Sequence, residues 1–159
     1  MKSHSRYAKK LNRKRVLICL VIFFALLPVF SYLHEAGHAL VCIADGNEAE
    51  ISVDIFNGGT TLCHGDVSNL FAYKISGGLV AGIVGTAAGI ALFRWKIPFI
   101  AITTIGIGHL INAGIEAFAD SYFTHGVEWS FFMGLVEFVI FLTLLIIFDR
   151  KMVKRNDVL

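Results

Sequence analysis

Residues 16–44 read VLICLVIFFALLPVFSYLHEAGHALVCIA, in which histidine, acidic and basic side chains occur only at His34, Glu35 and His38. A helix needs about 20 apolar residues to cross the roughly 30 Å hydrocarbon core of a bilayer. At about 1.5 Å per residue, this stretch would rise about 43 Å, which exceeds that thickness. It therefore predicts a membrane-spanning helix that carries a polar cluster near one of its ends.

Three further apolar blocks are long enough to span a membrane: Leu70–Phe93, Pro98–Phe118 and Trp129–Phe148. The chain of 159 residues is 56% hydrophobic and 16% charged, against about 25% charged residues in soluble domains. We therefore expect an all-α membrane protein with four transmembrane helices. Residues 16–148 would form its core, residues 1–15 a basic cytoplasmic arm, and residues 149–159 a basic cytoplasmic tail.

The charges are distributed unevenly along the chain. Seven of the 14 Lys and Arg residues precede Val16, whereas residues 45–66 hold five acidic residues and no basic one. The positive-inside rule then predicts that both termini are cytoplasmic and that the acidic connection faces the other side. This topology signal accounts for the basic arm, so we expect a lipid bilayer as partner and no nucleic acid. No small-residue cleavage site precedes the HEAGH motif, which predicts an uncleaved anchor.

The segment between the first two helices has the pattern of a small β-hairpin. Apolar Ile51, Val53 and Ile55 alternate within residues 51–56, and the turn-forming sequence Asn-Gly-Gly follows at 57–59. Residues 60–63 would form the return strand. An irregular loop is the alternative.

The three cysteines give no disulfide pattern, because their number is odd and their spacing is irregular. Cys19 and Cys42 lie in apolar helix, where we expect core packing. Cys63 precedes His64 in the outer loop and is a weak candidate for a metal ligand.

The motif HEAGH at residues 34–38 predicts a metal site. His34 and His38 are four residues apart, so they share one face of a helix and can bind one ion. HExxH on a helix is the zinc metalloprotease pattern, with Glu35 as general base. Ionisable groups within a membrane helix are energetically costly, which favours a functional role. The alternative is a pair of histidines bonded to helix backbone, with Glu35 facing water.

Two histidines leave a catalytic zinc one protein ligand short. The predicted third helix and its end offer His109, Asn112, Glu116 and Asp120. At about 100° per residue these four project within an arc of about 80°, forming one polar stripe. Such a stripe should face protein or a water-filled cavity. A hydrogen-bonded seam between helices, without a catalytic part, is the alternative.

The second helix carries glycines four residues apart, at Gly78 and Gly82 and again at Gly85 and Gly89. Small residues at this spacing allow helix backbones to approach closely in a membrane. We expect this helix to pack tightly beside the first one.

The chain resembles the site-2 protease family of intramembrane zinc metalloproteases. HEAGHAL is the form in which that family writes its HExxH motif, and a hairpin-like segment and a Gly-rich helix follow in the family's order. The family's second motif is Asn, Pro three residues later, then Asp-Gly at eight and nine. Here Asn112 is followed by Asp120 at plus eight, with Ile115 in place of the proline and Ser121 in place of the glycine.

The resemblance implies zinc ligands at His34, His38 and Asp120, a general base at Glu35, and a substrate-positioning role for Asn112. Glu116 and then His109 are the reserve candidates for the third ligand. We therefore expect an intramembrane endopeptidase with one zinc per chain, acting on a membrane protein or peptide.

An exposed hairpin edge could hold the substrate as an added strand, and Ile51 and Val53 are the candidate residues for this. Two other classes remain open at this point. One is a non-catalytic metal-binding membrane protein, such as a sensor or transporter. The other is a structural helical subunit that uses the glycine faces for partners.

Overall fold

The computed structural model describes residues 13–54, 58–119 and 126–156. The elements in chain order are α1 (Arg13–Ala44), β1 (Glu48–Asp54), β2 (Gly58–His64), α2 (Leu70–Ala91), α3 (Lys96–Phe118) and α4 (Gly126–Asn156). All four helices are long and apolar enough to cross a membrane. The structure thus confirms a mainly helical protein with four such helices and a hairpin between the first two.

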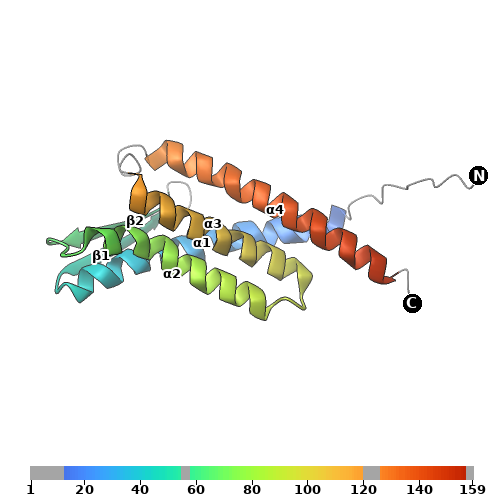
Figure 1. The fold of residues 1–159 in the computed structure, drawn as a ribbon, viewed down its shortest axis with the longest axis horizontal. Coiled ribbons are helices and arrows are strands. Elements are labelled where there is room, and N and C mark those ends of the chain that lie inside the picture. The colour runs from blue at the N-terminus through green and yellow to red at the C-terminus, as the bar shows by residue number, and fades with distance from the viewer. Residues whose placement is uncertain (1–12, 55–57, 120–125, 157–159) are drawn as a thin grey trace, which may run out of the picture.

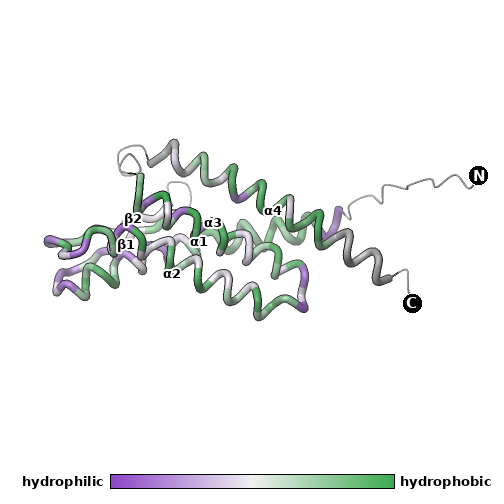
Figure 2. Tube along the Cα trace, in the orientation of Figure 1, coloured by the Kyte–Doolittle hydropathy of each residue, from purple (hydrophilic) through white to green (hydrophobic). Residues whose placement is uncertain are grey.

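The helices lie side by side along the long axis of the molecule, with the hairpin at one end (Figure 1). The start of α1, the α2–α3 turn and the end of α4 lie at the other end. Polar residues gather at the hairpin and at the α2–α3 turn, while the helices between them are largely apolar (Figure 2). Apolar helices with polar residues at both ends are the distribution expected of helices that cross a bilayer. The side of the membrane that each end faces stays a prediction.

The helix ends follow local signals in the sequence. Gly46 has a φ of 82° and closes α1, where the amide of Gly46 donates to Ile43 and that of Asn47 donates to Cys42. This paired pattern is a Schellman motif, which needs a residue with positive φ. At the start of α2, the Asn69 side chain accepts a hydrogen bond from the Ala72 amide.

Three helices are longer than their apolar blocks, and α3 is so by the two residues that precede Pro98. α1 begins at Arg13, three residues before Val16. α4 runs from Gly126 to Asn156, so the helix continues through most of the expected basic tail at residues 149–159.

The hairpin is antiparallel and longer than expected. Its register pairs Ile51 with Thr61 and Val53 with Gly59. Exposure alternates along both strands, so that one face is partly covered and the other is open. β1 starts at Glu48 rather than Ile51, and Gly59 belongs to β2 rather than to the turn. Residues 55–57 of the expected strand and turn lie outside the described residues.

The glycines of α2 confirm the prediction of close helix packing, chiefly against α3. A methyl group added at Gly78 would lie 2.5 Å from the Ala113 amide nitrogen, and one at Gly85 would lie 2.7 Å from the Gly106 Cα. Side chains of α1 complete the interior, where Phe30 of α1 packs with Ala81 of α2 and Ile105 of α3. Nearer the end of the molecule that lies away from the hairpin, a second apolar cluster joins α1, α3 and α4.

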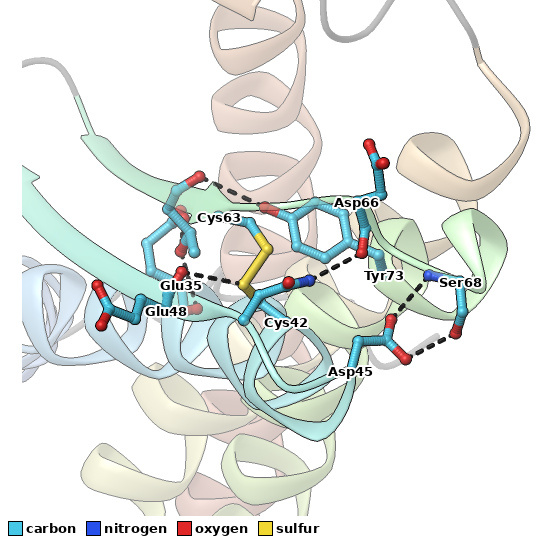
Figure 3. The surroundings of a disulfide bond; sticks show 10 residues. Glu35, Cys42, Asp45, Glu48, Cys63, Asp66, Ser68 and Tyr73 are labelled. Carbon is cyan, nitrogen blue, oxygen red and sulfur yellow. Dashed lines mark hydrogen bonds between the residues drawn. A yellow bond between two sulfur atoms is a disulfide. The ribbon is translucent and has the colours of Figure 1, made fainter.

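The prediction that the cysteines form no disulfide is wrong. Cys42 near the end of α1 is bonded to Cys63 of β2, with their Cα atoms 5.8 Å apart (Figure 3). Cys63 is therefore not a metal ligand, and Cys19 is a free, buried cysteine. Disulfides persist in oxidising compartments, which agrees with an outward-facing hairpin.

Side-chain hydrogen bonds hold the segment after the hairpin against the end of α1. Ser68 donates to the Asp45 carboxylate through its hydroxyl at 2.6 Å and its amide at 2.9 Å (Figure 3). These two bonds lower the pKa of the Asp45 carboxyl. The Asn47 side chain also donates to the Asp66 carbonyl at 2.8 Å. The hairpin is thereby fixed to α1 from its base.

Candidate metal centre

Two histidines of α1 and one glutamate of α3 meet in the interior. The Nε2 atoms of His34 and His38 are 3.1 Å apart. Glu116 Oε1 lies 3.0 Å from His34 Nε2, and Glu116 Oε2 lies 3.7 Å from His38 Nε2. All three residues are buried, and Glu116 is only 1% exposed. The group could hold a metal ion, because its ligand atoms lie within 4.8 Å of one another.

The spacing of these atoms fits a tetrahedral ion. Zinc bonds to His nitrogen and carboxylate oxygen are about 2.0–2.1 Å long, which separates two ligand atoms by about 3.3–3.4 Å. The two histidine nitrogens are 3.1 Å apart, and each lies near one oxygen of Glu116, His34 at 3.0 Å from Oε1 and His38 at 3.7 Å from Oε2. These separations are close to that value.

A backbone carbonyl orients His38. The Nδ1 atom of His38 lies 2.7 Å from the carbonyl oxygen of Tyr73, in the first turns of α2. A carbonyl only accepts, so Nδ1 carries the proton in this contact and Nε2 of the neutral ring keeps its lone pair. Metal-binding histidines commonly donate their other ring N–H in this way.

Two glycines provide the space for the histidine rings. A methyl group added at Gly77 of α2 would overlap His38 Nε2 and would lie 2.8 Å from His34 Nε2. A methyl group at Gly37 of α1 would overlap the Ser76 carbonyl oxygen and lie 2.8 Å from the Gly77 Cα. Helices α1 and α2 therefore approach closely at the site, and the ring nitrogens occupy the room that Gly77 leaves.

The surroundings of Glu116 also suit a cation. The Asn112 side chain donates to Glu116 Oε1 at 3.0 Å. Among the described residues, Oε2 is buried without a hydrogen-bond partner, and so is the Nδ1 atom of His34. A buried carboxylate is costly unless an opposite charge compensates it. A metal ion between Glu116 and the two histidines would supply that charge.

Only some of the predicted ligands belong to the group that the structure describes. His34 and His38 meet as expected, and the third member of the group is Glu116, the reserve candidate. Asp120 lies outside the described residues, which leaves its role a prediction. His109 lies beside His34, with ring centroids 5.3 Å apart, but it is not part of the three-residue group.

Glu35 lies under the hairpin. It is 7% exposed, and its Oε2 atom accepts a hydrogen bond of 2.8 Å from the hydroxyl of Thr61 in β2. A methyl group added at Gly59 would overlap the Glu35 side chain. The part of the alternative reading in which Glu35 faces water is therefore wrong, whereas His38 does bond to a helix carbonyl, that of Tyr73.

Ile51 and Val53 lie on β1, on the partly covered face of the hairpin. They pair with Thr61 and Gly59, which contact Glu35. Both are close in the fold to the strand over Glu35, and their binding of a substrate stays a prediction.

Sequence reasoning missed four residues that shape the site: Gly59, Thr61, Tyr73 and Gly77. The sequence Asn-Gly-Gly at residues 57–59 indicates a turn, and this signal conceals that Gly59 begins the inner face of β2. With the register known, strand alternation places Gly59, Thr61 and Cys63 on one face. The contacts of Tyr73 and Gly77 have no local signal, because they depend on how α2 packs against α1.

No protein-family model matches the chain, and no curated protein or solved structure matches it. The fold and the site define a class nonetheless. The chain is a protein of four membrane-compatible helices with a buried histidine–histidine–glutamate group capable of holding a metal ion.

Proposed function

We propose that this chain is an intramembrane zinc endopeptidase of the site-2 protease type. One observation carries the proposal: the two histidines of an HExxH motif and Glu116 lie together, buried between apolar helices. The motif by itself is a common five-residue pattern. Its histidines here are matched by a third ligand from a helix about 80 residues later in the chain.

Two histidines and a carboxylate form a ligand set that catalytic zinc uses, with a fourth position left for water or substrate. Zinc bound there would polarise a peptide carbonyl and lower the pKa of a water molecule. In this proposal His34, His38 and Glu116 hold the ion. Asp120, which the family resemblance implies as the third ligand, is the alternative to Glu116 at that position.

Glu35 is the proposed general base. It follows His34 directly in α1, and its buried carboxylate already accepts one hydrogen bond. The carboxylate would take a proton from the attacking water and pass it to the leaving amine.

Other residues of the chain would keep the ligands in place. The Tyr73 carbonyl holds the Nδ1 proton of His38, so that Nε2 faces the other ligands. The Asn112 amide donates to Glu116 and orients its carboxylate. Asn112 would therefore act through Glu116, besides the substrate-positioning role that the resemblance implies.

The proposed substrate is a peptide that spans the membrane or lies next to it. His34 and His38 lie ten and six residues before the end of α1, which corresponds to about 9–15 Å from the hairpin end of that helix. A helical substrate must unwind before its carbonyls become accessible. The hairpin could hold the unwound segment as an added strand beside Ile51 and Val53.

The test is zinc content and peptide cleavage in detergent-purified protein, with a panel of single-span peptides as substrates. Glu35→Gln should keep about one zinc per chain and lose cleavage by about 100- to 10,000-fold. Glu48→Gln is the matched control, since Glu48 lies on the exposed face of β1. It should cleave like the wild type.

The other outcomes separate the alternatives. Cleavage by Glu35→Gln would exclude the hydrolytic mechanism proposed here. A wild type that binds zinc and cleaves no peptide would favour a non-catalytic metal-binding protein. A wild type without zinc would favour a structural helical subunit.

A further inference from the structure

The hairpin contacts Glu35 through two residues on the inner face of β2. The Thr61 hydroxyl lies 2.8 Å from Glu35 Oε2 and 2.9 Å from the main-chain oxygen of Glu35. Two residues earlier, the space of a side chain at Gly59 is filled by Glu35, and an added methyl group would lie 2.8 Å from Oε1. The inner face of β2 is therefore shaped to the side chain of Glu35.

We propose that Thr61 is a positioning residue that holds the Glu35 carboxylate in the orientation it needs as general base. This inference rests on the hydrolase function proposed above. A threonine hydroxyl has one proton, and an ionised carboxylate only accepts hydrogen bonds. Two Glu35 oxygens lie within reach of this proton, and the charged Oε2 is a stronger acceptor than the main-chain oxygen. Donation to Oε2 fixes the rotation of the carboxylate and leaves Oε1 as the oxygen that receives a proton from water. No hydrogen bond to Oε1 is formed by the residues that the structure describes.

Thr61 can perform this role because it is fixed from three directions. Its strand pairs with β1, placing Thr61 opposite Ile51. Two residues later, the Cys63 disulfide ties β2 to α1. On the side of α2, the Tyr73 hydroxyl donates to the Thr61 carbonyl at 3.4 Å (Figure 3).

Tyr73 links the hairpin to the metal centre. Its hydroxyl bonds to Thr61, while its main-chain carbonyl accepts from His38 and its ring lies 5.0 Å from the His38 ring. One residue of α2 therefore contacts both the strand over the base and a candidate metal ligand. This arrangement would keep the distance and orientation between the Glu35 carboxylate and the His38 ring fixed.

A packing role for Thr61 and a positioning role predict different results. If Thr61 only packs β2 against α1, valine should serve as well, because it has nearly the same shape. If the hydroxyl orients Glu35, valine should impair turnover while leaving metal and substrate binding intact. Misplacing a catalytic group by about 1 Å can reduce the rate about 100-fold.

The experiment compares Thr61→Val, Thr61→Ser and Thr61→Ala in the full-length, detergent-purified chain, by zinc per chain and by kcat and KM on a cleaved peptide. Thr61→Val should lower kcat by about 10- to 100-fold with zinc content and KM unchanged, and Thr61→Ser should restore most of it. Thr60→Val is the matched control, because Thr60 is the same residue type on the exposed face of the same strand. It should leave kcat unchanged.

A wild-type kcat in Thr61→Val would overturn the inference while leaving the proposed function intact. Equal losses in Thr61→Val and Thr61→Ser would also overturn it. Should Thr61→Val fail to fold, serine and alanine give the same comparison, because they differ by the hydroxyl alone. Equal kcat values for that pair would refute positioning. If the zinc-loaded wild type cleaves nothing, the proposed function itself fails, which the wild-type measurement shows directly.

Discussion

Gly77 leaves the space into which the two histidine rings project, and replacing it by alanine should prevent metal binding without removing a ligand. The new methyl group would overlap His38 Nε2 and lie 2.8 Å from His34 Nε2. Ordinary contact starts at 3.4 Å, so the His34 ring would have to move by about 0.6 Å and the His38 ring by more. Metal–ligand distances tolerate only about 0.2 Å.

The helices cannot easily separate to make room for the methyl group. Gly37 of α1 already contacts Ser76 and Gly77, and Gly78 contacts the backbone of α3. The displacement should therefore fall on the ligands. We expect zinc affinity to fall at least about 100-fold, which is about 2.7 kcal/mol.

The assay is zinc per chain after equilibration with a chelator of known affinity, together with the melting temperature in detergent. Gly114→Ala is the matched control, because a methyl group there would meet no atom within 4 Å. Gly77→Ala with wild-type zinc affinity would refute the reasoning, since the histidine rings would then not occupy the positions described.

Four further substitutions test other predictions about the chain. Glu116→Gln should reduce zinc content strongly; Asp120→Asn is its counterpart, and a loss confined to Asp120→Asn would move the third ligand there. Cys63→Ala opens a disulfide with a sequence separation of 21 and should destabilise the oxidised protein by about 3 kcal/mol. Thermal unfolding with and without reductant measures this effect, and an unchanged melting temperature would contradict it. Ile51→Pro removes a backbone donor from β1 and should impair peptide cleavage if a substrate adds to the hairpin; unchanged cleavage would exclude that mode of binding.

The helices could be predicted because each signal is local. An apolar run of about 20 residues has few alternatives to a membrane helix, since its backbone must satisfy its own hydrogen bonds. The ends of several of these helices differ from the prediction. α1 starts at Arg13 and α4 continues to Asn156, because charged residues near a helix end can extend the helix beyond the apolar block.

The hairpin was predicted, but its inner face was not. Alternation of Ile51 and Val53 with polar residues indicates a strand, and Asn-Gly-Gly indicates a turn. The same glycine signal concealed Gly59 as a strand residue in contact with Glu35. The Cys42–Cys63 bond was missed because one cysteine lies in apolar helix, and the pairing exists only once the hairpin folds back onto α1.

The sequence by itself determined the number of long helices, the hairpin and the pairing of His34 with His38. These features depend on composition, on turn residues and on the four-residue spacing along one helix face. The sequence did not determine which side chain is the third member of the metal group. The four candidates on and just beyond α3 share one polar stripe, and no local rule chooses among them. The packing of the α2 glycines against α1 and α3 sets the position of α3 along its axis relative to the histidines. This packing brings Glu116 within 3.0 Å of His34. Only the tertiary structure could decide this, because the distance between residues on different helices depends on how their surfaces fit together.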